Sequence, residues 1–419
     1  MPADATALPA GAKPLGPVPA GYGQIDGELA VRGRPVSHWV EQAGGTPLFL
    51  YSRELIETRM AQLRAAMPER LGINYAVKAN PFEPILRLLS PLVNGFDIAS
   101  AGELEIVQAA GIDPARVSFA GPGKDDGELA AAIAAGVTLN IESEGELERA
   151  LAISNRAEQP VKAALRVNPD FTLRGSGMKM GGGAKPFGSD AAEVPAVARK
   201  LIGGGAEFRG LQIFTGSQAL DADAVIAMQR AVLGLADQLA REIGRPLPAL
   251  NMGGGFGIPY FAGDTPLDIE AVGGALQEKF ADLSPSLADA AIHIELGRYV
   301  VGEAGVYLTR ILDRKVSHGE VFLVTDGGLH HQLAASGNFG TVVRRNYPVA
   351  IASRLVEPPS EVASVVGRLC TPLDRLADSA WLPRAEVGDL VAVFCAGAYG
   401  ATASPAQFLG HGPAAEMLV

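Results

Sequence analysis

Short apolar, β-branched runs alternate with amphipathic Ala- and Leu-rich stretches between residues 73 and 295. Eight of the apolar runs are predicted to be strands, at residues 73–77, 96–99, 117–120, 137–141, 161–167, 209–214, 249–252 and 292–295. Helices are predicted between them, for example at residues 84–89, 102–110, 128–135, 144–153, 223–241 and 268–280. Strands that are apolar along their whole length are typical of a parallel sheet covered by helices on both faces.

Eight strand and helix alternations are compatible with a closed (β/α)8 barrel or with an open, doubly wound sheet. The polar residues favour the barrel, because nearly all of them fall at or just beyond the C-terminal ends of the predicted strands: Lys78, Asp97, Arg166, Asn168, Ser217, Gly253, Gly254, Gly255, Glu295 and Arg298. In a (β/α)8 barrel this end carries the active site. We therefore expect an α/β fold with a (β/α)8 barrel over residues 47–298.

After residue 298 the pattern changes to Val-, Tyr- and Leu-rich strands separated by turn residues, at 306–312, 321–325, 361–366 and 390–394. Helical spacing returns at most at residues 377–380. This pattern predicts a C-terminal all-β barrel or sandwich over residues 299–419. Residues 44–51 could open the barrel or belong to this β domain.

The N-terminal part of the chain is predicted to lie outside the barrel. Residues 1–24 are rich in Ala, Pro and Gly and are expected to be a mobile tail. Residues 25–46 form a further segment that could pack on the β domain. The first two dozen residues contain neither a basic nor an apolar signal region, so we expect a cytoplasmic protein.

Composition excludes several classes of function. The chain has 419 residues, of which 48% are hydrophobic, enough for a large buried core. Its net charge is −11 and it lacks a Lys/Arg block, so we expect neither a nucleic-acid nor a membrane partner. No apolar run reaches the ~20 residues that span a bilayer. The two cysteines, Cys370 and Cys395, form no disulfide framework and no zinc motif, and no metal is expected.

Lys78 lies where the first predicted strand ends and a polar, Pro-containing loop begins. A lysine amine can form an imine with an aldehyde, and burial among apolar neighbours would favour the neutral, nucleophilic form. The alternative is a solvated lysine at a strand end, which Lys78 taken alone would favour.

Gly253, Gly254 and Gly255 follow the seventh predicted strand. Three successive residues without Cβ allow backbone N–H groups to converge on an anion, although a tight strand-to-helix turn is the alternative. Barrels often bind phosphate in the loops after strands seven and eight, and Ser217 adds a hydroxyl after strand six. An aldehyde-capturing lysine and an anion cradle together fit pyridoxal 5'-phosphate.

Seven motifs, in order from residue 47 to the C-terminus, resemble the fold-type III pyridoxal-phosphate decarboxylases, the family of diaminopimelate and ornithine decarboxylases. They lie at residues 75–80, 95–103, 216–218, 253–257, 295–298, 367–370 and 397–400. The runs 178–183 and 370–374 are most similar to the exosortase-associated branch and to decarboxylases of carrier-bound amino acids. The resemblance implies an alanine racemase-like barrel and a homodimer with shared active sites.

The resemblance also implies roles for the barrel residues. Lys78 would bind the cofactor aldehyde, and the phosphate would be held by Gly253, Gly254, Gly255, Ser217, Arg298 and Tyr399. Asp97 would lie near the lysine and Arg166 near the cofactor ring, although both could instead cap barrel layers. Phe214 stands where the family has a stacking histidine, so that stacking is kept but a proton role is lost.

Glu295 would face the pyridine nitrogen. A carboxylate there keeps the ring protonated, so the ring can accept the electron pair released when a Cα bond breaks. The related racemases have an arginine at this point, so Glu295 favours decarboxylation over racemisation. An ion pair of Glu295 with Arg298 that closes the barrel is the structural alternative.

Cys370 has two interpretations. Its spacing alone favours a small buried residue, whereas the resemblance implies a thiol that reaches the second subunit's site and protonates the carbanion after carbon dioxide leaves. Cys395, inside an apolar run, is expected in the core. Thr371 departs from the family, because diaminopimelate and ornithine decarboxylases have there an acid that binds the distal ammonium.

Other residues could take over substrate binding. Asp374, His330 and His331 are candidates to bind the distal group. Arg344 and Arg345 could bind a distal carboxylate or a carrier's phosphate, although a solvated basic pair is the alternative. We therefore predict a pyridoxal-phosphate amino-acid α-decarboxylase whose substrate could lack a free distal ammonium or be carrier-linked. A racemase or epimerase and a non-catalytic pyridoxal-phosphate-binding protein are the alternatives.

Overall fold

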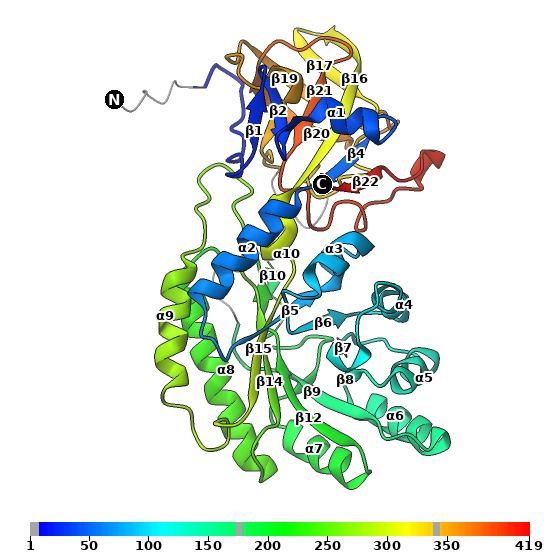
Figure 1. Cartoon of the computed structure of the whole chain (residues 1–419), viewed down its shortest axis with the longest axis vertical. Coiled ribbons are helices and arrows are strands. Elements are labelled where there is room, and N and C mark those ends of the chain that lie inside the picture. Colours follow the sequence, from blue (N-terminus) through cyan, green and yellow to red (C-terminus); the bar gives the residue numbers. More distant parts are fainter. Residues whose placement is uncertain (1–7, 173–177, 180, 338–343) are drawn as a thin grey trace. The chain divides into compact units, whose positions relative to one another are not determined.

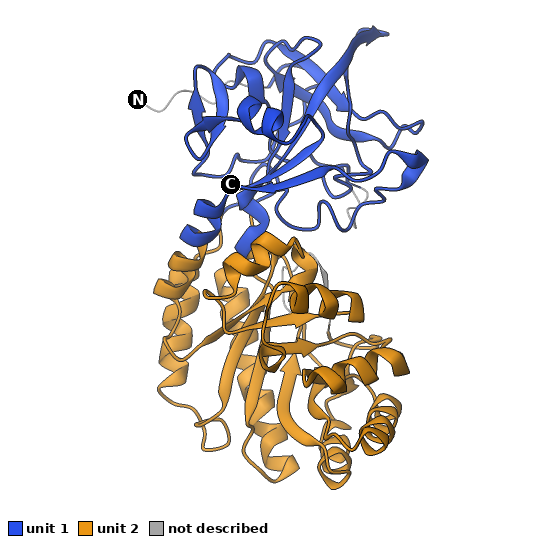
Figure 2. Cartoon of the chain, turned by 45° about the vertical axis from the view of Figure 1, so that its right-hand side comes forward, with its two compact units in different colours: residues 1–58, 259–265, 300–419 blue, residues 59–258, 266–299 orange. Residues whose placement is uncertain are grey.

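The computed structural model describes residues 8–172, 178–179, 181–337 and 344–419 (Figure 1). The chain divides into two units, which are coloured separately in Figure 2. The β unit comprises residues 1–58, 259–265 and 300–419. The barrel unit comprises residues 59–258 and 266–299.

A closed parallel sheet forms the centre of the barrel unit. Its strands are β5 (Gly72–Ala76), β6 (Gly95–Ile98), β7 (Val117–Phe119), β8 (Thr138–Ile141), β9 (Lys162–Asn168), β12 (Glu207–Ile213), β14 (Ala249–Gly254) and β15 (Ala291–Leu296). Each strand pairs in parallel with the next, and β15 pairs with β5 to close the ring. The predicted (β/α)8 barrel is therefore confirmed, with strand bounds within two residues of those expected from the apolar runs.

Three two-residue strands lie at the C-terminal end of the barrel. β11 (Ser189–Asp190) extends the sheet beside β9. β10 (Met178–Lys179) pairs antiparallel with β13 (Gly216–Ser217). The long connection between β9 and β12 is therefore tied to the loop that contains Ser217.

Helices surround the barrel strands (Figure 1). They are α2 (Arg53–Ala66), α3 (Glu83–Leu89), α4 (Ala101–Ala109), α5 (Asp126–Ala135), α6 (Glu144–Ala157), α7 (Val194–Gly203), α8 (Ala222–Ile243) and α9 (Ile269–Phe280). Local polar residues determine where several of them begin. The Asp125 carboxylate accepts from the Glu128 N–H while the Glu128 side chain accepts from the Asp125 N–H, a capping box at the start of α5.

The β unit contains a mixed sheet. Its strands are β4 (Leu48–Tyr51), β16 (Gly305–Ser317), β17 (Glu320–Thr325), β18 (Val349–Ile351), β19 (Glu361–Val366), β20 (Arg375–Leu382), β21 (Leu390–Val393) and β22 (Ala415–Leu418). β4 pairs with β16 and β22, so residues 48–51 belong to this sheet and not to the barrel. The expected barrel start at residue 47 is therefore too early.

The helical spacing noted at residues 377–380 was misleading, because these residues lie within β20. The pairing of β19 with β20 shifts register here, and Ser379 has a φ of 49°. A bulge inserts an extra residue and so breaks the two-residue alternation expected of a strand.

The N-terminal residues pack on the β unit. β1 (Gly23–Ile25), β2 (Glu28–Val31) and β3 (Arg34–Pro35) form a small sheet followed by α1 (Val36–Gln42). Leu29 and Val36 share a buried cluster with Leu48 and Val306. The predicted mobile tail is wrong for residues 8–24, which form bridges such as Lys13 with Ala380. Residues 1–7 lie outside the described part.

Within the described ranges of the chain, no helix combines the length and the apolarity required to cross a bilayer.

Candidate active site

Lys78 lies in a one-turn 3-10 helix, η1 (Val77–Ala79), that directly follows β5. Val77 and Ala79 are buried, whereas Lys78 is exposed, so the backbone is anchored on both sides of the lysine. The burial expected for Lys78 is therefore not found. Its Nζ lies 5.7 Å from the centre of the Phe214 ring, which brings the ends of β5 and β12 together.

The glycine run at the end of β14 is packed too closely for any side chain at Gly253 or Gly254. A Cβ on Gly253, whose φ is 68°, would lie 3.0 Å from Cδ2 of Phe214. A Cβ on Gly254 would lie 1.9 Å from the Glu295 carbonyl oxygen. The Gly253 N–H donates to Asn251 Oδ1 at 2.8 Å, so this N–H already has a partner within the chain, and the role of Gly253 in holding a phosphate stays a prediction. A phosphate bound here would therefore accept hydrogen bonds mainly from the N–H groups of residues after Gly253.

Backbone hydrogen bonds lock the Ser217 loop to this turn. Ala219 N–H donates to the Gly255 carbonyl at 2.9 Å, and Gly257 N–H donates to the Ala219 carbonyl at 2.8 Å. The Gln218 side chain donates to the Ile258 carbonyl at 2.6 Å. The residues directly after β13 and directly after β14 are therefore held together by hydrogen bonds, and such a fixed backbone suits an anion cradle.

Glu295 and Asp97 are two buried carboxylates in the interior of the barrel. Glu295 Oε2 accepts from Gln212 Nε2 at 2.8 Å and from Asn251 Nδ2 at 2.9 Å. Asp97 Oδ1 accepts from Ser118 Oγ and from Asn74 Nδ2. Among the described residues, Asp97 Oδ2 has no hydrogen-bond partner.

The pKa of Asp97 is raised to about 8, first by burial and then by the nearby charge of Glu295, while Lys78 and the hydrogen bonds lower it. Two acids in one buried site oppose each other's ionisation. A cationic ligand would relieve this repulsion. The site thus fits a group that presents a positive ring nitrogen to Glu295 and an anion to the glycine turn.

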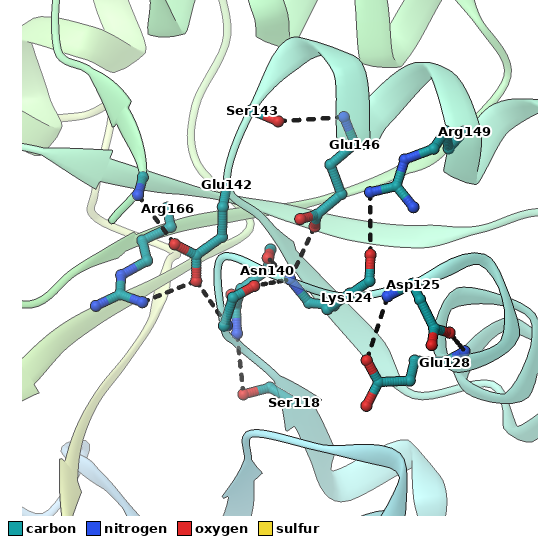
Figure 3. Close-up of polar contacts among 12 residues, drawn as sticks. Ser118, Lys124, Asp125, Glu128, Asn140, Glu142, Ser143, Glu146, Arg149 and Arg166 are labelled. Atoms are coloured by element: carbon teal, nitrogen blue, oxygen red, sulfur yellow. Dashed lines mark hydrogen bonds and ion pairs between the residues drawn. The ribbon is translucent and has the colours of Figure 1, made fainter. Parts of the chain in front are cut away.

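Arg166, on β9, forms a buried ion pair with Glu142 (Figure 3). Its Nη1 lies 2.8 Å from Glu142 Oε1, and the guanidinium stacks 4.9 Å from the centre of the Phe187 ring. Arg298 begins the short helix α10 (Arg298–Val301) directly after Gly297. A Cβ on Gly297 would lie 2.6 Å from the Ala79 Cβ, so the start of α10 lies against the Lys78 turn.

The remaining predicted residues lie in the β unit. Asp374 is buried, and its two oxygens accept from the Leu329 N–H at 2.7 Å and the Leu369 N–H at 2.9 Å. Burial raises its pKa, whereas these amides lower it. Asp374 therefore holds the 367–374 turn through these two hydrogen bonds, and its binding of a distal ammonium stays a prediction.

Cys370 and Thr371 lie in that turn, and Cys370 is exposed and free. The interpretation of Cys370 as a buried core residue is therefore wrong, whereas Cys395 is buried as expected. Thr371 Oγ1 accepts from the Leu373 N–H at 3.3 Å. Tyr399 is partly buried with a φ of 57°, and its contact with a phosphate stays a prediction.

His330 and His331 are buried in the β unit, with ring centres 3.9 Å apart and ring planes tilted by 42°. His331 Nδ1 pairs with the Tyr307 hydroxyl at 2.9 Å and Nε2 with the Gly412 carbonyl at 3.0 Å. Burial lowers the pKa of both histidines, that of His330 to about 4. Both are therefore neutral at pH 7, which does not suit the binding of a carboxylate.

Arg344 and Arg345, both in the β unit, contact neighbouring groups. Arg344 Nη2 donates to the Leu373 carbonyl at 3.3 Å, and Arg345 Cζ lies 3.8 Å above the Phe261 ring centre. Arg344 is therefore attached to the turn that contains Cys370. Arg345 is a cation–π partner and not simply a solvated charge.

Several residues that shape the site were not identified from the sequence. They are the hydrogen-bond partners of the named acids and arginine: Asn74, Ser118, Glu142, Gln212 and Asn251. A usable signal existed, because each of them is a polar residue within or directly after an apolar barrel strand. Their partners, however, are determined by which strands meet around the barrel.

The fold and the site define a class of (β/α)8-barrel protein in which a lysine, a glycine run and two buried carboxylates lie at or next to the C-terminal ends of barrel strands. The family described as "Pyridoxal-dependent decarboxylase, pyridoxal binding domain" matches residues 53–302. The chain belongs to this family, and its cofactor is pyridoxal 5'-phosphate.

Individual relatives extend this result over most of the chain. It is 34% identical over 381 residues to the L-glutamyl-[BtrI acyl-carrier protein] decarboxylase of Niallia circulans, covering 89% of this chain and 88% of the relative. It is 33% identical to the diaminopimelate decarboxylase of Archaeoglobus fulgidus, covering 95% and 93%. The crystal structure of diaminopimelate decarboxylase from Helicobacter pylori complexed with L-lysine is similar at a TM-score of 0.80, with 26% identity and coverage of 91% and 94%.

Proposed function

We propose that this pyridoxal-phosphate-dependent decarboxylase acts on an amino acid whose distal end carries no free ammonium, and specifically on one attached to a carrier as an acyl thioester. One observation carries the proposal: the 370–374 turn offers no unpaired carboxylate. Thr371 stands where the family has its ammonium-binding acid, and both oxygens of Asp374 accept backbone N–H groups. The similarity to a decarboxylase of a carrier-bound glutamyl group supports it.

Desolvation gives the physical reason for this preference. A distal ammonium that enters a site without an acid loses its hydration and gains no partner, which costs binding free energy. An acyl group has no charge to desolvate and does not lose this free energy. The diaminopimelate decarboxylases among the relatives act, by their names, on a diamino acid. The position of Thr371 therefore separates this chain from them.

The chain's own residues have distinct parts in the reaction. Bound pyridoxal phosphate supplies an electron sink for the pair released when carbon dioxide leaves. Lys78 would provide the amine that holds the cofactor through its aldehyde. Glu295, oriented by Gln212 and Asn251, presents a carboxylate that keeps the ring nitrogen protonated. Cys370 donates the proton that replaces the carboxylate at Cα.

A screen for carbon dioxide release tests the substrate class. Free lysine, ornithine, diaminopimelate and glutamate are compared with the same amino acids linked to a carrier protein or to a pantetheine thioester. We expect the thioester-linked substrates to be turned over and the diamino acids to be poor substrates. Turnover of diaminopimelate or lysine with kcat/KM of about 10⁴ M⁻¹s⁻¹ or more would contradict the proposal.

Thr371→Glu sharpens the same test. The new carboxylate should shift preference toward diamino acids, because it offers the ammonium a partner. Thr371→Gln has nearly the same size without the charge and is the matched control. Equal effects of the two substitutions would show that size, not charge, determines selectivity at this position.

We further propose a homodimer in which Cys370 of one subunit serves the Lys78 of the other. Lys78→Ala and Cys370→Ala homodimers should each be nearly inactive. Mixing them should restore roughly a quarter of wild-type activity under random pairing, because one site in each heterodimer is intact. Exchange of subunits without recovery would contradict the shared site. Two free thiols support a reducing, cytoplasmic location.

A further inference from the structure

Four charged side chains lie buried together near the C-terminal ends of β7, β8 and β9: Lys124, Glu142, Glu146 and Arg166 (Figure 3). We call them the charge cluster. Their side chains are between 1% and 9% exposed. Two are cationic and two anionic, so the cluster is neutral as a whole. A neutral, fully paired arrangement is what allows charges to remain ionised inside a protein.

Lys124 saturates its three N–H donors. Its Nζ donates to the Gly121 carbonyl at 2.7 Å, to Glu146 Oε1 at 2.8 Å and to the Asn140 carbonyl at 3.0 Å. The ion pair with Glu146 thus joins α6 to the loop after β7. This part of the cluster has no donor left for a ligand and fixes the position of the Gly121 turn.

Glu142 connects that turn to Arg166. Its Oε1 accepts from the Gly121 N–H at 2.6 Å and from Arg166 Nη1 at 2.8 Å, while Oε2 accepts from the Gly188 N–H at 2.9 Å. Gly188 has a φ of 74°, and a Cβ on it would lie 2.8 Å from the Arg166 carbonyl oxygen. One carboxylate therefore holds three separate segments around one guanidinium.

The charge cluster contacts two residues of the candidate site, Arg166 and, through Ser118, Asp97. The Arg166 guanidinium is held by Glu142 at one end, and the Phe187 ring, next to Gly188, stacks on it. The cluster also reaches the other site acid, because Asn140 Nδ2 donates to Ser118 Oγ at 3.2 Å and Ser118 donates to Asp97. The same network thus orients two residues that belong to the candidate site.

We propose that Glu142 is a positioning residue that fixes the orientation of Arg166 toward the cofactor and cancels its charge. This inference rests on the proposed role of Arg166 beside the cofactor ring. An uncompensated guanidinium there would oppose the protonated ring nitrogen that Glu295 maintains. Glu142 allows Arg166 to donate hydrogen bonds without adding net positive charge, and the Lys124–Glu146 pair keeps Glu142 in place through Gly121.

The test measures cofactor binding by the full chain, independently of turnover. Pyridoxal phosphate is titrated into cofactor-free protein to obtain Kd, and the bound cofactor's absorbance is then followed against pH. Glu142→Gln should weaken binding about tenfold or more, since it leaves a buried cation unpaired. It should also lower the pH midpoint of the absorbance change by about half a unit to one unit, because added positive potential disfavours protonation. Glu142→Asp should recover most of both.

A double-mutant cycle separates positioning from general structural support. In an Arg166→Gln background, Glu142→Gln should change Kd and the pH midpoint little, because no guanidinium remains to be oriented. An equal effect in both backgrounds, or no effect in wild-type background, would overturn the proposal. If Glu142→Gln alone does not fold, the double variant, which buries no unpaired charge, is compared with Arg166→Gln in the same way.

Glu144→Gln is the matched control, because it removes one carboxylate two residues away whose side chain is 60% exposed and pairs with Lys200. It should leave Kd and the midpoint unchanged, and a loss like that of Glu142→Gln would overturn the proposal as a general charge effect. Failure of the wild-type protein to bind pyridoxal phosphate at Lys78 would instead contradict the proposed function itself. The two failures are therefore distinguishable.

Discussion

The barrel end and the 367–374 turn of the β unit each bury an aspartate, and the two carboxylates differ in how completely they are hydrogen-bonded. Asp374 accepts a backbone N–H on each oxygen. Asp97 accepts two side-chain donors on one oxygen, whereas within the described residues its other oxygen has no partner. A fully satisfied buried acid stabilises a fold, whereas a partly satisfied one costs free energy until a ligand arrives.

The largest effect is expected from removing the satisfied acid. Asp374→Ala leaves two buried N–H groups without acceptors, each costing about 1–3 kcal/mol, so the free energy of unfolding should fall by about 3 kcal/mol. Chemical denaturation of the cofactor-free protein measures this, with the exposed Asp313→Ala as control. A loss below about 1 kcal/mol would contradict a structural role for Asp374.

Asp97→Asn should change the free energy of unfolding in the opposite direction, so that the variant is more stable than wild type. The folded-state pKa of Asp97, about 8, lies above its unfolded value, so the unfolded chain binds fewer protons and stability falls as pH rises from about 4 to about 8. The cofactor-free Asn variant lacks this loss and should be more stable than wild type at pH 7 by about 1 kcal/mol or more. The two stabilities should converge near pH 4. An Asn variant that is less stable at pH 7 would break the comparison between the two aspartates.

The smallest effect is expected at His330, a fully buried histidine of the β unit whose two ring nitrogens have no hydrogen-bond partner among the described residues. Its pKa is lowered to about 4 by burial and then by His331, His411 and Arg368. Wild-type stability should therefore fall as pH drops from about 6.5 to about 4, by about 1 kcal/mol at pH 5.5.

His330→Leu should remove that acid-side loss and leave stability at pH 7 nearly unchanged. Thermal unfolding between pH 5 and pH 7 measures the difference. The stabilities of the two units would then depend on pH with opposite sign. Rising pH would destabilise the barrel unit through Asp97, whereas falling pH would destabilise the β unit through His330. If His330→Leu loses as much stability at low pH as wild type does, a group other than His330 causes that loss.

The sequence was sufficient for the barrel because its strands are buried on both faces and therefore appear as uninterrupted apolar runs. The sequence also predicts that Lys78, Asp97 and Glu295 lie at the same end of the barrel, since parallel strands of a barrel end on the same side. It failed at residues 48–51, because a short apolar strand carries no sign of which sheet it joins. β4 pairs with β16, which lies more than 250 residues later.

The hydrogen-bond partners were beyond the reach of sequence patterns. The sequence around Asp374 does not show that Leu329 and Leu369 present N–H groups to its oxygens, so sequence patterns indicate only a possible substrate ligand. No sequence motif singles out Glu142, although it binds Arg166 and two turns. Such roles depend on which loops meet in space and are determined only when the barrel closes.

The central claim is that Lys78 is the residue that binds the cofactor. Reduction of the holoenzyme with borohydride fixes the cofactor on its lysine, and peptide mapping then identifies that residue. We predict a single modified peptide containing Lys78, and loss of both the label and the cofactor absorbance in Lys78→Ala. A label on another lysine, or one that persists in Lys78→Ala, would contradict the account.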